Sequence, residues 1–165
     1  MTGSPQSRAR SRALRLLAAR PRTEAQILER LVRAGFEAEA EGVVAWLRDL
    51  RYLDDEAFAR DRAGSLVAPG RLGPRMAEQR LVAAGIPRDA ARRAVREALG
   101  DEETKRCRLL AEQRAGAAGA VPGAVPDNLG EREKARLSRF LLGRGFSGRA
   151  VSAALGVYVD DAEDR

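Results

Sequence analysis

The sequence predicts an all-α protein made of three tandem three-helix repeats that form an elongated, curved array. Ala, Leu, Arg and Glu dominate the composition, and these residues lose little conformational freedom in a helix. Aromatic residues make up only 4% of the chain, and β-branched residues are sparse. Repeats are indicated because one pattern typical of a helix end occurs three times. A chain of 165 residues is long enough for one such array with a continuous core.

The repeated pattern reads apolar, apolar, any, any, Gly, apolar. We expect the two paired apolar residues to lie on the buried face of a helix's last turn. The glycine would take the left-handed conformation that ends the helix, and the next apolar residue would fold back onto that turn. The three copies occupy residues 31–36, 81–86 and 141–146.

Each copy lies between two helix starts. Before it, Thr23 and Gln26 match a capping box, and Gly73 followed by Pro74 offers a cap with proline at the first helical position. After it, acids, a proline or Ser147 begin the next helix.

A further helix precedes each unit, with apolar residues at helical spacing in the first and acids at the N-terminus of the other two. A run of Ala, Gly, Val and Pro without a helical face predicts a flexible loop in the third unit. We therefore expect a flexible tail over 1–7, repeats over 8–53, 54–100 and 101–159, the loop over 115–130, and an acidic tail over 160–165.

The composition argues against most enzyme chemistry. The chain has no histidine, which is the commonest general base and metal ligand, and its single cysteine, Cys107, cannot form an intramolecular disulfide. Cys107 falls in mid-helix, where inert packing is the favoured interpretation. We expect no cofactor and no metal. Without a run of apolar residues long enough for a membrane span or a secretory signal, we expect a cytoplasmic protein.

The positive charge is concentrated in the first two-thirds of the chain, and the net charge is +6. Such a distribution suits phosphate or an acidic partner, although a solvated arginine-rich tail is the alternative interpretation. The arginines that precede the first acid, Glu24, are Arg8, Arg10, Arg12, Arg15, Arg20 and Arg22.

A group of acids at residues 54–56 lies beside aromatic residues and could in principle perform acid–base or metal chemistry. Its position at a helix start favours capping instead. Tyr52, Leu53 and Phe58 are then expected in the core between the first two repeats, and Trp46 is expected to pack rather than to stack on bases.

The segment 70–75 superficially resembles a phosphate-binding loop, but it lacks the P-loop lysine and hydroxyl, and no strand precedes it. Two interpretations stay open. Arg71 and Arg75 could hold an anion against exposed backbone N–H groups, or the loop could serve only to cap the next helix.

These segments resemble the bacterial RecX family. Tyr52-Leu53-Asp54-Asp55 with Phe58-Ala59 is similar to a signature at the end of its first repeat, although Arg51 stands where the family usually has glycine. Similar matches in the second and third repeats are Gly73-Pro74-Arg75 with Gly85, and Arg139-Phe140-Leu141-Leu142 with Arg144-Gly145-Phe146-Ser147. The resemblance covers about residues 10–157. It implies tandem three-helix repeats and a negative modulator of the RecA recombinase that acts through the filament groove, with possible contact to DNA.

Three functions are compatible with the sequence. The first is a non-enzymatic, monomeric regulator of the RecA filament, which would contact single- or double-stranded DNA and no membrane. The alternative is a stand-alone helical protein that binds DNA phosphates through arginine-rich helices, and the third is a carboxylate-dependent phosphoesterase. The arginines expected to face the RecA filament or DNA phosphate are Arg71, Arg75, Arg80, Arg139, Arg144 and Arg149.

Overall fold

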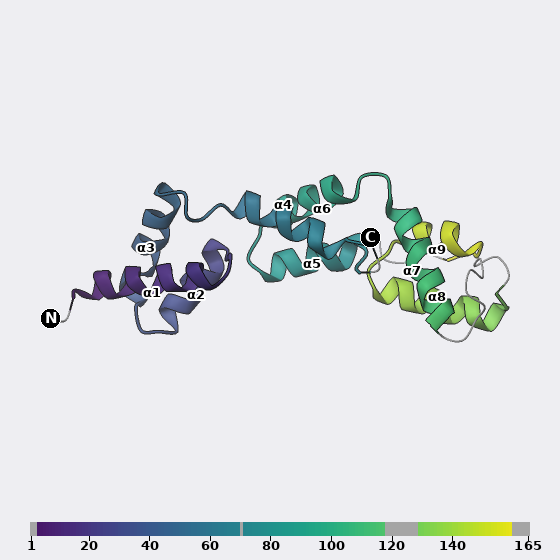
Figure 1. The fold of residues 1–165 in the computed structure, drawn as a ribbon, viewed down its shortest axis with the longest axis horizontal. Coiled ribbons are helices and arrows are strands. Elements are labelled where there is room, and N and C mark those ends of the chain that lie inside the picture. Colours follow the sequence, from purple (N-terminus) through teal and green to yellow (C-terminus); the bar gives the residue numbers. More distant parts are fainter. Residues whose placement is uncertain (1–2, 70, 118–128, 160–165) are drawn as a thin grey trace.

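The computed structural model describes residues 3–69, 71–117 and 129–159. Nine α-helices and no strand lie in these ranges, so the predicted all-α class is confirmed. The helices follow one another along a single long axis, from α1 at one end to the α7–α9 group at the other (Figure 1). They are α1 (Pro5–Ala19), α2 (Glu24–Val32), α3 (Glu37–Asp49), α4 (Asp55–Leu66), α5 (Pro74–Ala83), α6 (Arg88–Leu99), α7 (Glu103–Ala117), α8 (Glu131–Gly143) and α9 (Gly148–Leu155).

The helices pack in three groups of three, namely α1–α3, α4–α6 and α7–α9. Each group encloses its own cluster of buried apolar side chains. Leu31, Leu81 and Leu141 are fully buried at equivalent places in the three clusters. Packing between helices of different groups is slight, so the array depends on other contacts to hold its groups together.

The predicted glycine turns are present in all three groups. Gly35, Gly85 and Gly145 have φ angles of 81°, 94° and 89°, which is the left-handed conformation. The N–H of the residue after each glycine donates back to the carbonyl of the buried leucine, at 3.0, 3.1 and 3.2 Å in chain order. This closes the helix end in the manner of a Schellman motif.

One part of the repeat prediction is wrong. Only the first residue of each apolar pair is buried, and the second is exposed: Val32 by 42%, Val82 by 39% and Leu142 by 37%. Adjacent residues on an α-helix are about 100° apart, so a narrow buried stripe covers one of them and leaves the other at its edge.

The helix starts agree with the expected caps. The side chains of Thr23, Asp54 and Ser147 accept hydrogen bonds from backbone N–H groups three residues later, at 3.2, 2.8 and 3.2 Å. Gly73 is the N-cap of α5, with Pro74 at its first position.

Two segments that were expected to be flexible are helical in part. Residues 5–7 are helical rather than part of a tail, because Ser4 caps α1 by accepting from the Ser7 N–H at 3.2 Å. Residues 115–117, which were expected in the loop, belong to α7 instead, and Ala115 is buried. Residues 1–2, most of that loop (118–128) and the acidic tail (160–165) lie outside the described residues.

Tyr52 does not join the core, although Leu53 is buried and Phe58 packs against the second cluster. Tyr52 is 60% exposed. The cause lies at the end of α3, where Arg51 takes the left-handed conformation (φ 58°) usual for glycine and the Tyr52 N–H donates to the Leu47 carbonyl at 2.9 Å. Because Leu53 points into the core, the adjacent Tyr52 is left in solvent.

Candidate partner-binding surface

The first two helix groups meet where a turn of one contacts a helix start of the other, and we call this contact the first joint. The Thr23 hydroxyl, at the start of α2, donates to the Ala84 carbonyl in the α5–α6 turn at 2.6 Å. A Cβ placed on Gly85 would overlap the methyl group of Ala25. The absence of a side chain at Gly85 is therefore what lets the two segments approach.

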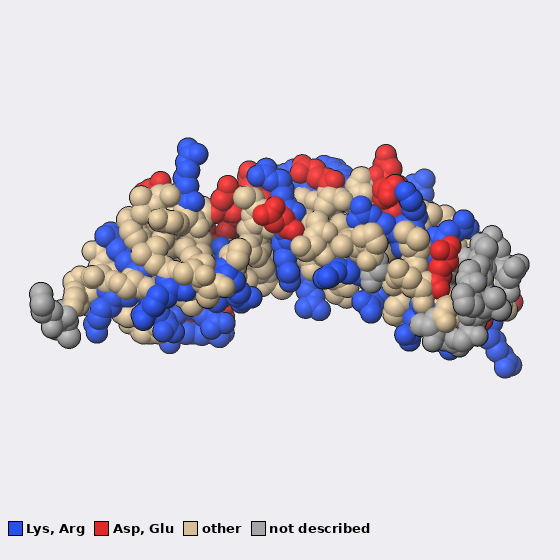
Figure 2. Space-filling view, in the orientation of Figure 1, with Lys and Arg blue, Asp and Glu red and all other residues tan. Residues whose placement is uncertain are grey.

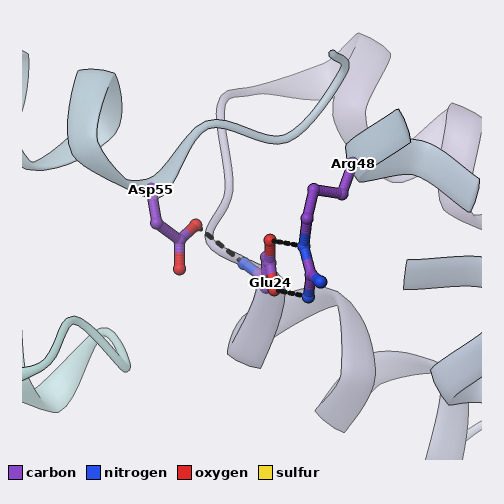
Figure 3. A network of polar contacts seen from close by, with 3 residues as sticks. All are labelled: Glu24, Arg48 and Asp55. Carbon is purple, nitrogen blue, oxygen red and sulfur yellow. Dashed lines mark hydrogen bonds and ion pairs between the residues drawn. The ribbon is translucent and has the colours of Figure 1, made fainter. Parts of the chain in front are cut away.

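A polar network supports the first joint (Figure 3). Asp55, at the start of α4, accepts a hydrogen bond from the Glu24 N–H at 3.0 Å. The Glu24 carboxylate in turn accepts two hydrogen bonds from the Arg48 guanidinium, at 2.6 and 2.5 Å. Burial raises the pKa of Asp55, and the hydrogen bond from Glu24 opposes that rise. Asp55 thus caps α2 of the preceding group, whereas Asp54 caps α4 itself.

The second joint repeats this arrangement between the second and third groups. The N–H groups of Gly73 and Arg75 donate to the carbonyls of Arg144 and Gly145, at 2.9 and 3.0 Å. The two interpretations of segment 70–75 are thereby separated. Backbone donors that could have held an anion at the start of α5 bind the α8–α9 turn instead, so the anion-loop interpretation loses its main donors.

The side chain of Arg106 adds a second link between these groups. Its guanidinium donates to the Val67 carbonyl at 2.6 Å and to the Ala98 carbonyl at 3.4 Å, so the start of α7 is tied to the ends of α4 and α6. Arg144 and Arg114 both lie over the ring of Phe140, at 5.2 and 5.1 Å from its centre. These contacts hold part of the basic surface in place.

The six arginines expected to face a partner lie in different places along the array. The backbones of Arg75 and Arg144 meet at the second joint, with Arg71 two residues before the joint's Gly73. Arg149 lines a groove of about 490 Å³ beside this joint, together with Arg92 and Arg96. That groove also contains acids, and Glu78 pairs with Arg92 at 4.0 Å.

Arg80 belongs to the first joint rather than to the neighbourhood of Arg71 and Arg75. It lines a groove of about 500 Å³ with Arg20 and Arg62, and Asp61 is the acid in that lining. Arg20 was not among the six arginines expected to face a partner, but it lines the same groove as Arg80 from a position 60 residues earlier. Arg139 is exposed on α8. Sequence reasoning missed Arg62 entirely, because only the packing of α4 against α5 places it in the groove.

The charges are unevenly distributed over the face shown in Figure 2. Lys and Arg are frequent along the lower, concave edge, from the α1–α2 end to the α8 end, and they also occur along the upper, convex edge, where most of the visible Asp and Glu lie.

Three further features of the described residues concern metal ligands, the single cysteine and helix length. Residues 3–69, 71–117 and 129–159 contain no group of three or more His, Cys, Asp or Glu that could hold a metal ion. Burial, and secondarily the charge of Glu103, raise the pKa of the Cys107 thiol to about 12, so it is a packing residue at neutral pH. Within the same ranges every helix is too short or too polar to span a membrane.

Three-helix groups linked by turn-to-cap joints, with arginine-lined grooves beside both joints, define a helical-repeat protein. The family model described as "RecX, first three-helix domain" matches residues 9–47. Regulatory protein RecX of Syntrophotalea carbinolica is 35% identical over 149 residues, which cover 87% of this chain and 92% of that protein. The chain therefore belongs to the RecX family of regulatory proteins.

Further relatives agree. Regulatory protein RecX of Cronobacter sakazakii is 34% identical and covers 87% of both chains. The crystal structure of RecX from Lactobacillus salivarius superimposes with a TM-score of 0.77 at 19% identity, over 92% of this chain and 95% of that one. At this identity the likeness concerns the fold, and it confirms the predicted array of helices.

Proposed function

We propose that this protein is a negative regulator of the RecA recombinase, which binds the RecA–DNA filament and slows its ATP hydrolysis, strand exchange and related recombination and SOS activities. Membership of the RecX family across most of the chain is the observation that carries the proposal. The protein would act in the cytoplasm as a monomer, without a cofactor and without catalysing a reaction itself.

The shape and charge of the surface support this function. A bowed array presents a long surface to a filament, and its basic edge faces a partner that contains phosphate backbone. The grooves beside the two joints place arginines from distant parts of the chain together, as with Arg20, Arg62 and Arg80. An elongated partner could therefore contact several helix groups at once, and the weak contacts would add.

The direct test is the rate of ATP hydrolysis by RecA on single-stranded DNA while this protein is titrated in. We expect inhibition at or below one protein per RecA subunit, with no hydrolysis by the protein alone. An unchanged rate at equimolar concentration with a cognate RecA would refute the proposal. Binding measured separately to RecA, to DNA and to the filament identifies the alternative, because a stand-alone DNA-binding protein would bind the filament no more tightly than DNA alone.

A pair of matched variants tests the partner-facing arginines. One changes Arg71, Arg80 and Arg139 to Glu, and the control changes Arg30, Arg93 and Arg132 to Glu, which alters the net charge equally. Exposed arginines contribute little to folding, so the melting temperatures should stay close to that of the parent protein. Inhibition should fall at least tenfold in the first variant only, and added salt should weaken the parent's binding. Equal inhibition by both variants would mean that the partner binds elsewhere.

A further inference from the structure

A third groove lies on the first helix group, away from both joints, and has about 620 Å³ of space. We call it the α1 groove. It lies between α1 and the α2–α3 turn, and its lining contains arginine and serine but no acid. Its lining includes Arg8, Arg12, Arg15, Ser7, Ser11 and Phe36.

The arginines of this groove form one stripe along α1. Residues 8, 12 and 15 are separated by four and three positions, so at 3.6 residues per turn their side chains project in nearly the same direction. The opposite face of α1 carries the buried Ala9 and Ala13, which pack in the first cluster. The three arginines of the stripe therefore do not contribute to packing in the core.

The charges of the stripe are unbalanced within the molecule. Arg8, Arg12 and Arg15 are exposed, and none forms an ion pair with another residue of the described ranges. Like charges three and four residues apart on a helix repel one another. Acids appear only past Phe36, where Glu37 and Glu39 line a separate groove that shares Arg8. The α1 groove itself thus holds all three arginines in a lining that contains no acid.

We infer that the α1 groove binds the phosphate backbone of duplex nucleic acid, without reading its sequence and without requiring the recombinase. The stripe spans roughly 10 Å of helix axis at about 1.5 Å per residue. Duplex DNA presents one charge per about 1.7 Å of its axis, so several phosphates fall within that span. An extended acidic peptide presents same-side carboxylates only about every 7 Å.

The side chains fit phosphate better than bases. Arginine donates to phosphate oxygens through a planar fork, and the hydroxyls of Ser7 and Ser11 are further donors in the lining. Phe36 is the aromatic residue in this lining and is half-buried, so the groove offers no series of rings on which single-stranded bases could stack. These side chains therefore provide contact with the nucleic-acid backbone alone.

The test measures binding of a fluorescent 20-base-pair duplex to the full chain by anisotropy over a range of salt concentrations. Three phosphate contacts contribute about 2.7 to the slope of log affinity against log salt. We expect the Arg8→Gln, Arg12→Gln, Arg15→Gln variant to lose that part of the slope. Between 50 and 200 mM salt, the parent should then lose about 40-fold more affinity than the variant.

The control variant, Arg30→Gln, Arg93→Gln, Arg132→Gln, changes the net charge equally and takes one arginine from each helix group. It should keep most of the parent slope. If the two variants bind alike, net charge and not the groove attracts the duplex, and the inference is overturned. It is also overturned if polyglutamate competes better than the duplex at equal charge, or if single-stranded DNA binds more tightly and with the larger slope.

A second variant tests the inference even if the triple variant fails to fold. Ser11→Glu places one acid in the groove without removing an arginine, and it should weaken duplex binding several-fold while far-UV circular dichroism stays unchanged. An unaffected affinity would contradict the inference even if the triple variant failed to fold. Because RecA is absent from every arm, this result is separate from the outcome of the ATPase experiment.

Discussion

Replacing Gly35 and Gly145 by alanine, one at a time, should distinguish two losses of stability. One comes from the left-handed backbone, and the other comes from disturbing a joint. Gly35 and Gly145 have similar φ angles, 81° and 89°. No atom lies within 4 Å of a Cβ placed on Gly35, whereas a Cβ on Gly145 would lie 2.6 Å from the Cβ of Met76 and nearer still to its backbone nitrogen. Gly35→Ala therefore carries only the conformational cost, roughly 1–2 kcal/mol. Gly145→Ala adds the cost of overpacking, about 1–3 kcal/mol more.

The assay is urea-induced unfolding followed by circular dichroism, with the two variants measured beside the parent. Because stability in a repeat array is shared between units and their interfaces, Gly145→Ala should also broaden the transition, as the third helix group begins to unfold separately. Gly35→Ala should shift the midpoint without that broadening. Equal losses and equally sharp transitions in the two variants would refute the idea that the Gly145 turn holds the second joint.

Four further predictions concern Arg51, Arg106, Cys107 and Asp55. Arg51→Gly should raise the free energy of unfolding by up to about 1 kcal/mol in thermal denaturation, because glycine adopts the left-handed conformation without strain; a lower melting temperature would contradict this. Arg106→Met should lower the free energy of unfolding, measured in urea, by about 1–2 kcal/mol, because two backbone carbonyls lose a charged donor. The Cys107 thiol should react with a disulfide reagent far more slowly in the native protein than in denaturant, because its pKa is about 12. Burial raises the pKa of Asp55, so the folded state binds more protons and this residue's contribution to stability falls as pH rises through that raised pKa. Asp55→Asn keeps an acceptor for the Glu24 N–H and should remove this part of the pH dependence, whereas Asp55→Ala should remove the same pH dependence and be less stable than Asp55→Asn by about 1 kcal/mol.

Local signals predicted the helices well. The caps at Thr23, Asp54 and Ser147 and the three glycine turns are set by residues within one helical turn of one another, so the sequence contains nearly all the information. The unit ranges 8–53, 54–100 and 101–159 stay a prediction. The errors concern residues whose burial depends on tertiary packing. Tyr52, Val32, Val82 and Leu142 were expected to be buried and are exposed.

The candidate surface was predicted less well, because sequence distance does not measure distance across a joint. Arg20 and Arg80 line one groove although 60 residues separate them, whereas Arg75 and Arg80, only five apart, belong to different joints. The arginine-rich start of the chain was a usable signal. Its spacing of four and three residues at positions 8, 12 and 15 could have identified the α1 stripe, but the groove itself required the α2–α3 turn.

The joints also explain why the charged surface is built from side chains and not from helix termini. A helix start normally offers unpaired N–H groups to an anion. Here Thr23 and Glu24 at the start of α2, and Gly73 and Arg75 at the start of α5, use their donors to bind the neighbouring group. Because helices of different groups pack so little against each other, these few hydrogen bonds fix the angle between groups, and that angle decides which arginines share a groove. A substitution that weakens a joint should therefore alter partner binding even when it leaves every arginine in place.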